Sequence, residues 1–182
     1  MSAAVAAGLE LIQLREKRLT ARVLFELSEQ SAALTRGSPT RLLVNDRADI
    51  AAAAGAAGVH LTTHSIDAAI IRRTFGKDFL IGVSTHSLAE AEVAKEVGAD
   101  FVVFGPVFAT PSKENYGPPA GLENLKSVAK PLTPFPVLAL GGVGVTNARQ
   151  CLQAGASGIA GISLFAEPER LDEIVRTLRV RM

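Results

Sequence analysis

Short apolar runs recur along the whole chain and alternate with segments of helical pattern. Runs in which nearly every position is apolar are typical of parallel strands that are buried on both faces. The pattern therefore predicts seven strands, at Leu11–Glu16, Arg41–Asn45, Gly58–Leu61, Leu80–Thr85, Phe101–Pro106, Pro136–Gly142 and Gly158–Ser163.

Helical patterns fill the intervals between these runs, and some of them carry clear end signals. Ser87 is followed by Glu90 three positions later, which is the form of a capping box. Glycine follows the predicted helix end at Gly55, Gly98 and Gly155, where it commonly serves as a C-cap. The predicted helices are Thr20–Thr35, Arg47–Ala54, Asp67–Phe75, Ser87–Val97, Leu122–Val128, Thr146–Ala154 and Pro168–Arg179.

Seven successive strand–helix units predict a parallel sheet, either open or closed into a barrel. A TIM-type (β/α)8 barrel has eight such units. Residues 1–8 have the pattern of the last turns of a helix. We therefore expect one N-terminally truncated barrel domain over residues 1–182, without the first strand and most of the first helix. An open barrel of this kind is expected to be weakly stable or to pair with a partner, for example as a homodimer.

Composition and charge exclude several classes of protein. The chain has 182 residues, is 48% hydrophobic and 20% charged, and carries a net charge of +1, which predicts a globular protein without the basic excess of a nucleic-acid binder. Its single cysteine, Cys151, excludes an internal disulfide and fits a reducing compartment. No basic n-region precedes the apolar N-terminal stretch, and no apolar run reaches the roughly 18 residues of a membrane helix. We expect a cytoplasmic protein that does not enter the membrane.

Polar residues gather where the first two predicted strands end. Gln13, Arg15 and Lys17 alternate along the first strand and therefore share one face. Cations on the interior face of a barrel are costly unless an anionic ligand or inward carboxylates neutralise them. Asn45 and Asp46 end the second strand, where they either cap the next helix or supply oxygen ligands to Mg²⁺.

Later strand ends carry further candidates for chemistry. Ser84 and His86 share a face at the end of the fourth predicted strand, and His86 is either structural or an acid–base group. Two other features suit a phosphate: a loop with hydroxyls and a lysine, and glycine-rich ends of the last two strands, where backbone N–H groups bind anions in barrel enzymes. These features are Thr110, Ser112 and Lys113, then Gly141 and Gly142, then Gly161, Ile162 and Ser163.

Six segments together resemble one enzyme family over nearly the whole chain. They read IQLREK, LLVNDRADIA, GVHL, IGVSTHS, FVVFGPVFATPSK and LALGGV. Their order and spacing are similar to those of thiamine phosphate synthase and the related thiazole tautomerase. The resemblance implies a (β/α)8 barrel and a transferase of thiamine biosynthesis that joins hydroxymethylpyrimidine diphosphate to a thiazole phosphate, with Mg²⁺ assisting the departure of diphosphate. Its partners would be these two small phosphorylated substrates.

The resemblance also implies roles for single residues. The substrate diphosphate would be bound by Gln13, Arg15, Lys17, Asn45, Ser84 and Lys113, and Asp46 would be a Mg²⁺ ligand. The thiazole phosphate would be bound by Thr110 and Ser112 and by the backbone of Gly142, Ile162 and Ser163. We count His86, Lys113 and Arg15 as the candidate catalytic residues.

One departure from the family pattern keeps other functions open. After GVHL the synthases usually continue with Gly-Gln-Glu-Asp, and the aspartate is a second Mg²⁺ ligand, whereas this chain has Ser65 at that position. Asp67 could replace it or belong to the first helical turn. A thiazole tautomerase, an isomerase that would use His86 for proton transfer, needs no Mg²⁺. A non-catalytic phosphate-binding relative is the third hypothesis.

Overall fold

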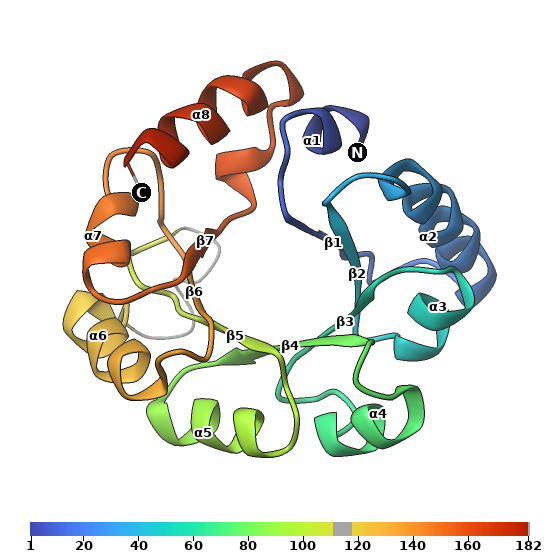
Figure 1. Cartoon of the computed structure of the whole chain (residues 1–182), viewed down its shortest axis with the longest axis horizontal. Coiled ribbons are helices and arrows are strands. Elements are labelled where there is room, and N and C mark those ends of the chain that lie inside the picture. Colours follow the sequence, from blue (N-terminus) through green and yellow to red (C-terminus); the bar gives the residue numbers. More distant parts are fainter. Residues whose placement is uncertain (111–117, 182) are drawn as a thin grey trace.

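The computed structural model describes residues 1–110 and 118–181. Seven strands pair in parallel and in the order of the sequence, and they curl around a common centre with the helices outside them (Figure 1). This arrangement confirms the predicted TIM-type β/α barrel. The strands are β1 (Leu11–Leu14), β2 (Arg41–Asn45), β3 (Gly58–Leu61), β4 (Leu80–Thr85), β5 (Phe101–Phe104), β6 (Val137–Leu140) and β7 (Gly158–Ala160).

Three helices begin after side-chain caps, of which the sequence analysis predicted the one at Ser87. Thr20 Oγ1 accepts a hydrogen bond from the Val23 amide, and Ser87 Oγ accepts one from the Glu90 amide. Asp67 caps its helix in the same way, because its carboxylate accepts a hydrogen bond from the Ala69 amide at 2.7 Å. The helices are α1 (Ser2–Ala6), α2 (Ala21–Thr35), α3 (Ala48–Ala53), α4 (Ala68–Phe75), α5 (Leu88–Glu96), α6 (Gly121–Leu132), α7 (Ala148–Gln153), α8 (Leu171–Arg181) and the short 3₁₀ helices η2 (Ser163–Phe165) and η3 (Pro168–Arg170).

Four strands end earlier than predicted, each by two or three residues. Strand β1 stops at Leu14, so Arg15 and Lys17 lie in the loop that follows it rather than on the interior face. Strands β5, β6 and β7 likewise stop before a glycine-containing turn. The prediction extended apolar periodicity through residues whose backbone has already turned, as the positive φ of Gly141 shows.

Two separate apolar layers hold the sheet in place. The outer layer lies between strands and helices and includes the fully buried Val44, Val59 and Ile81. The inner layer fills the centre of the barrel and is built around Leu43, Phe101 and Val103, with partly buried leucines from neighbouring strands. Residues on alternate positions of a strand therefore belong to different layers.

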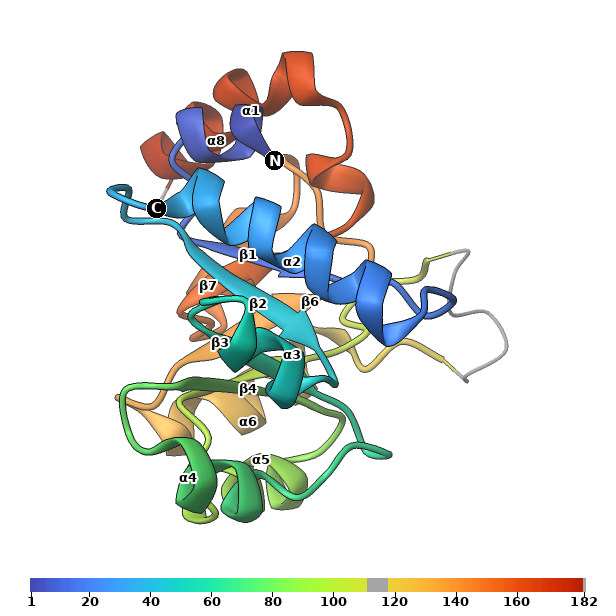
Figure 2. The ribbon, with the colours of Figure 1, turned by 90° about the vertical axis from the view of Figure 1, so that its right-hand side faces the viewer.

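The ring of helices continues where the sheet stops. Strands β1 and β7 stand at opposite ends of the strand order. Outside them, α1 and α8 lie side by side and share an apolar cluster of Ala7, Leu171 and Val175 (Figures 1 and 2). Arg179 donates a hydrogen bond of 2.7 Å to the carbonyl of Gly8 across this contact.

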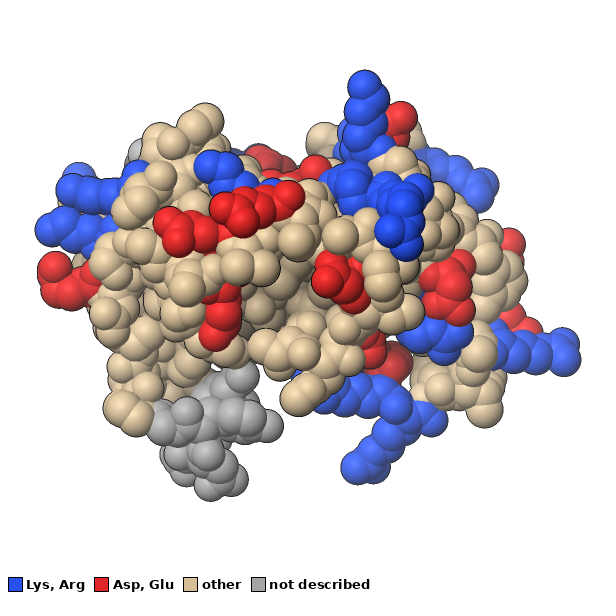
Figure 3. Space-filling model, turned by 90° about the horizontal axis from the view of Figure 1, so that it is seen from below, with Lys and Arg blue, Asp and Glu red and all other residues tan. Residues whose placement is uncertain are grey.

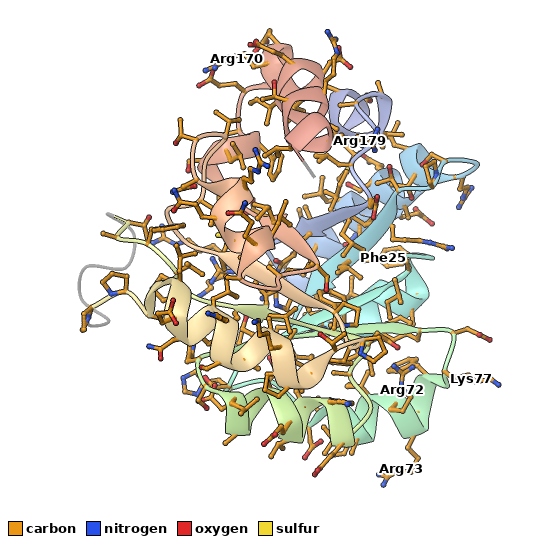
Figure 4. The ribbon with its side chains drawn as sticks, turned by 60° about the vertical axis from the view of Figure 1, so that its left-hand side comes forward. Phe25, Arg72, Arg73, Lys77, Arg170 and Arg179 are labelled. Carbon is orange, nitrogen blue, oxygen red and sulfur yellow. The ribbon has the colours of Figure 1, made fainter. Side chains whose placement is uncertain are left out.

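Arg72 joins several segments at the amino-terminal end of the strands. Its guanidinium donates to the carbonyls of Gly76, Phe79 and Gly98 and forms an ion pair with Asp100 at 2.7 Å. The side chains of the neighbouring cations Arg73 and Lys77 extend away from this centre (Figure 4). On the face that Figure 3 shows, basic and acidic side chains are interspersed. None of the helices in the described part of the chain is long and apolar enough to cross a membrane.

Candidate active site

Four polar side chains from four consecutive strands form a continuous hydrogen-bonded chain. Gln13 Nε2 donates to Asn45 Oδ1 at 2.9 Å, and His60 Nδ1 lies 2.9 Å from Gln13 Oε1. Ser84 Oγ in turn lies 3.1 Å from His60 Nε2. We call Asn45, Gln13, His60 and Ser84 the polar relay. It places at one site three of the residues that the sequence analysis selected.

Strand register explains why these four residues meet. Asn45 is directly opposite His60 in the pairing of β2 with β3. Gln13 lies two positions after Leu11, and Ser84 two positions after Gly82, so each is on the inward face of its strand. All four are at or near the carboxyl ends of the strands, which is where active sites of β/α barrels lie.

His60 is the most buried member of the polar relay. Only 7% of its surface is exposed, and this loss of hydration, aided by the positive charge of Arg15, lowers its pKa from 6.5 to about 4. The imidazole is therefore neutral near pH 7. Beside it, the Phe101 ring covers Gly82, where a Cβ atom would lie only 2.3 Å from the ring. The polar relay thus stands against an apolar wall.

Asp46 follows β2 in an unusual backbone conformation. Its φ is 64°, and it is the one residue other than glycine with positive φ among residues 1–110 and 118–181. Such conformations cost free energy and cluster at functional sites. Its amide donates to the carbonyl of His60 at 2.9 Å, which ties the end of β2 to β3. The neighbouring Arg47 is paired with Asp49, whose carboxylate has its pKa lowered by that hydrogen bond.

Ser65 has a local structural role in the loop after β3. Its Oγ accepts from the Thr62 amide at 2.7 Å and lies 3.2 Å from Thr62 Oγ1. Within the described ranges there is no cluster of three His, Cys, Asp or Glu side chains. A Mg²⁺ ion commonly takes one or two protein carboxylates and completes its shell with water and substrate phosphate oxygens. Asp46 is a carboxylate of this kind, and its role as a Mg²⁺ ligand stays a prediction.

His86 is held by the backbone at the end of β4. Its Nδ1 lies 2.6 Å from the carbonyl of Gly105, and its amide donates to Glu90 at 2.7 Å. A carbonyl oxygen can only accept, so Nδ1 carries the proton and, in the neutral ring, Nε2 carries the lone pair. Glu90 thus completes the predicted capping box at His86 rather than at Ser87.

The residues predicted to bind the thiazole phosphate come from three loops. Gly142 has a φ of 61°, and a Cβ atom there would lie 2.6 Å from the Ala109 carbonyl, so a larger residue would separate the loop after β6 from the loop after β5. Ile162 is 76% exposed just before η2, which begins at Ser163. Thr110 ends the first described range, while Ser112 and Lys113 lie outside the described residues. These binding roles stay predictions.

The expected arrangement of the cations is wrong in one respect. Arg15 and Lys17 are exposed in the loop after β1 and do not face inward from a strand. Arg15 is nevertheless close enough to His60 to affect its pKa. The sequence analysis also gave no role to His60 itself. A histidine between Val59 and Leu61 in a buried strand was the available signal, since a buried polar side chain needs a partner.

Comparison with known proteins identifies the same family as the quoted segments. A family model described as thiamine monophosphate synthase matches residues 1–165. Thiamine-phosphate synthases of Roseiflexus sp. (strain RS-1) and Methanoculleus marisnigri are 42% and 39% identical to the chain, covering 90% and 98% of it and 69% and 84% of their own lengths.

A solved structure agrees with these sequence matches. The thiamine phosphate pyrophosphorylase from Pyrococcus furiosus superposes with a TM-score of 0.85 at 31% identity, and the match covers 99% of this chain and 86% of that protein. The chain belongs to the thiamine monophosphate synthase family.

Proposed function

We propose that this protein is a thiamine phosphate synthase. It would join hydroxymethylpyrimidine diphosphate to thiazole phosphate and release diphosphate. The observation that carries the proposal is the polar relay, which lies near the carboxyl ends of the strands and includes the residue before Asp46, in a chain that the synthase family model matches over residues 1–165. The cytoplasm is the proposed compartment because the single cysteine fits a reducing environment.

The diphosphate of the pyrimidine substrate would lie over the ends of β1, β2 and β4. Arg15 and Lys17 supply positive charge from the exposed loop, where they attract the anion without the desolvation cost of a buried cation. Gln13, Asn45 and Ser84 supply short, oriented polar groups from the strands. Asp46 would hold Mg²⁺, which neutralises negative charge on the departing diphosphate. The protein then needs mainly positioning and electrostatics, with no nucleophile of its own.

The thiazole phosphate would lie on the other side of the barrel mouth. The close contact of Gly142 with Ala109 brings the loops after β5 and β6 together, as a shared anion site requires. Thr110, Ser112, Ile162 and Ser163 belong to the same proposed site, and Lys113 would contact the diphosphate. The Phe101 ring, whose centroid lies 6.3 Å from that of His60, would make one side of the polar relay apolar, where electrostatic interactions are stronger.

The first test measures both products. Purified protein is mixed with the pyrimidine diphosphate and the thiazole carboxylate phosphate, with Mg²⁺ or with chelator, and diphosphate and thiamine phosphate are followed. We expect equal release of both products with Mg²⁺ and none with chelator. Asp46→Ala should lower the rate by about 100-fold or more, while His86→Ala has a smaller effect. Absence of both products under all conditions would contradict the synthase.

A second candidate function rests on His86. Its Gly105 contact leaves Nε2 as a base, and Ser65 replaces the second expected carboxylate, so thiazole tautomerisation without a metal is chemically available. In that case the two thiazole tautomers would interconvert in chelator, His86→Ala would abolish the reaction and Asp46→Ala would be mild. Nothing in the described residues specifically favours a non-catalytic role. The homodimer stays a proposal, which sedimentation of the purified chain tests.

A further inference from the structure

The polar relay has a direction, because each of its bonds has one donor and one acceptor. Gln13 gives an N–H to Asn45 Oδ1, so its Oε1 faces His60 and must accept from Nδ1–H. His60 Nε2 then carries a lone pair and accepts a hydrogen bond from the Ser84 hydroxyl. In this first state the amide NH₂ of Asn45 is free for other partners, whereas Ser84 offers only oxygen lone pairs.

The same heavy atoms permit the opposite direction. If His60 carries its proton on Nε2, it donates to Ser84 Oγ, and the Ser84 hydroxyl is free to donate elsewhere. His60 Nδ1 then needs a donor, so the Gln13 amide must turn by half a rotation and give its N–H to His60. Gln13 Oε1 next requires an N–H from Asn45, whose amide also turns and leaves Asn45 Oδ1 free. The Nδ1 proton passes to water, while the Ser84 hydroxyl gives its proton to Nε2 and takes another from water, so the imidazole gains no net proton.

These two directions suit different ligands. An anion beside Ser84 needs the hydroxyl as a donor, and a divalent cation beside Asp46 is better served by the Asn45 oxygen than by its NH₂. Only the second state provides both together. The first state offers neither the Ser84 donor nor the Asn45 acceptor, although all hydrogen bonds within the polar relay are formed in both states.

We propose that binding of diphosphate reverses the direction of the polar relay, and that His60 is the positioning residue that makes Ser84 and Asn45 change together. The inference rests on the proposed function in two respects, namely that diphosphate binds beside Ser84 and that Mg²⁺ is held beside Asp46. His60 itself touches no reacting atom. His60 transmits the change because it is buried and both of its ring nitrogens are hydrogen-bonded. If only one neighbour changed its donor, a ring nitrogen would lose its partner, at the full desolvation cost of a buried polar group.

The direct test is the tautomer of His60 in the full chain. The protein is labelled with ¹⁵N at histidine, and long-range ¹H–¹⁵N correlation spectra distinguish Nδ1–H from Nε2–H at pH 7.5. The chain has three histidines, and His64→Gln and His86→Gln assign the His60 signals by elimination. We expect Nδ1–H in the free protein and Nε2–H when Mg²⁺ and saturating inorganic diphosphate are present. His64 is exposed in the loop after β3 and serves as the internal control.

Calorimetric titration with inorganic diphosphate separates the two ways of failing. If diphosphate binds and His60 keeps the same tautomer, the reversal is overturned while the synthase proposal stands. If diphosphate does not bind, the reversal is overturned as well, and the product assay decides the synthase proposal independently. Neither measurement needs a substitution at His60, so a variant that fails to fold would not affect the result.

A second measurement tests the coupling itself. The diphosphate affinities of Asn45→Ala, Ser84→Ala and the double variant are compared, first with His60 present and then with His60→Phe. With His60 present the effects should be non-additive by roughly fivefold. In the His60→Phe background, the fold-change in affinity of the double variant should equal the product of the two single fold-changes. Independent effects in both backgrounds would contradict the role of His60, provided that thermal melting shows each variant to be folded.

Discussion

The two halves of the barrel interior differ in chemistry although they are built from the same repeating unit. Strands β1 to β4 contribute the polar relay to the upper part of the interior. Strands β5 to β7 contribute an apolar surface, which is formed by Phe101, Val103, Leu138, Leu140 and Ala160. The difference is that hydrogen-bonded polar groups lie on the inner face of the first half, whereas the inner side chains of β5 to β7 serve packing.

Removing the centre of the apolar half should have the largest effect. Phe101 is buried against Gly82, so Phe101→Ala leaves a cavity and should lower the free energy of unfolding by about 3–5 kcal/mol. Denaturant titration measures the loss. Ile70→Ala, at a side chain that is 44% exposed, is the matched control and should change the free energy by well under half as much. Equal effects of the two substitutions would refute a stabilising role for the apolar half.

The polar half should make stability depend on pH. In the folded protein the pKa of His60 is about 4, whereas the unfolded chain takes up a proton near the ordinary value of 6.5. Stability is therefore complete above pH 6.5 and is lost as the pH falls toward 4, by about 3 kcal/mol in total. His60→Gln should remove this part of the pH dependence, and His64→Gln should retain it. Unfolding titrations between pH 7.5 and pH 4 provide the comparison, and identical slopes for wild type and His60→Gln would contradict the prediction.

The exposed cations beside the polar half should affect binding more than turnover. Arg15→Ala should raise the KM for the pyrimidine diphosphate by about tenfold with little change in folding stability, because a charge-assisted contact is lost. Arg18→Ala removes an exposed cation from the same loop and is expected to leave this KM nearly unchanged. Steady-state kinetics at low and moderate salt would show whether the two arginines differ; the same KM for both variants would place the anion elsewhere.

Adding a carboxylate to the proposed metal site should have the smallest effect. Ser65→Asp adds a carboxylate in the loop after β3 and should lower the Mg²⁺ concentration for half-maximal activity by roughly threefold. Part of the gain is offset because Ser65 Oγ supports the loop through Thr62. Ser65→Ala reports the cost of that support alone. An unchanged or higher Mg²⁺ requirement in Ser65→Asp, beyond the change in Ser65→Ala, would place the ion away from this loop.

The outer layer of the barrel was more predictable than its inner layer. Val44, Val59 and Ile81 lie in short apolar runs, and Thr20, Asp67 and Ser87 are cap residues with a local signal, so strand and helix positions followed from neighbouring residues alone. The contact of Gln13 with His60 joins residues 47 positions apart and depends on the register of three strands. No local pattern contains that register, which is why His60 was missed.

The ends of β2, β3 and β4 were predicted correctly, and the other four strand ends were missed for a physical reason. Arg15 and Lys17 continue the alternation of β1, but β1 and β2 are paired in register only from Leu11 to Leu14. The sequence shows that Ser65 departs from the family pattern. It does not show the hydrogen bond between Ser65 and Thr62, because that bond depends on the turn that the loop forms. Residues that serve chemistry at the mouth of a barrel lie where secondary structure ends, and sequence patterns give the least information there.

The Arg72 centre has a consequence for the order in which the chain folds. Its contacts connect residues 4 to 28 positions apart, so the loops that they close are short and cost little chain entropy. The Arg179–Gly8 bond that joins α8 to α1 spans 171 positions. Contacts between residues close in sequence tend to form early in folding, and contacts between distant residues tend to form late. We therefore expect the unit of α4, β4 and β5 to become protected from hydrogen exchange first during refolding, and the α1–α8 contact to form last.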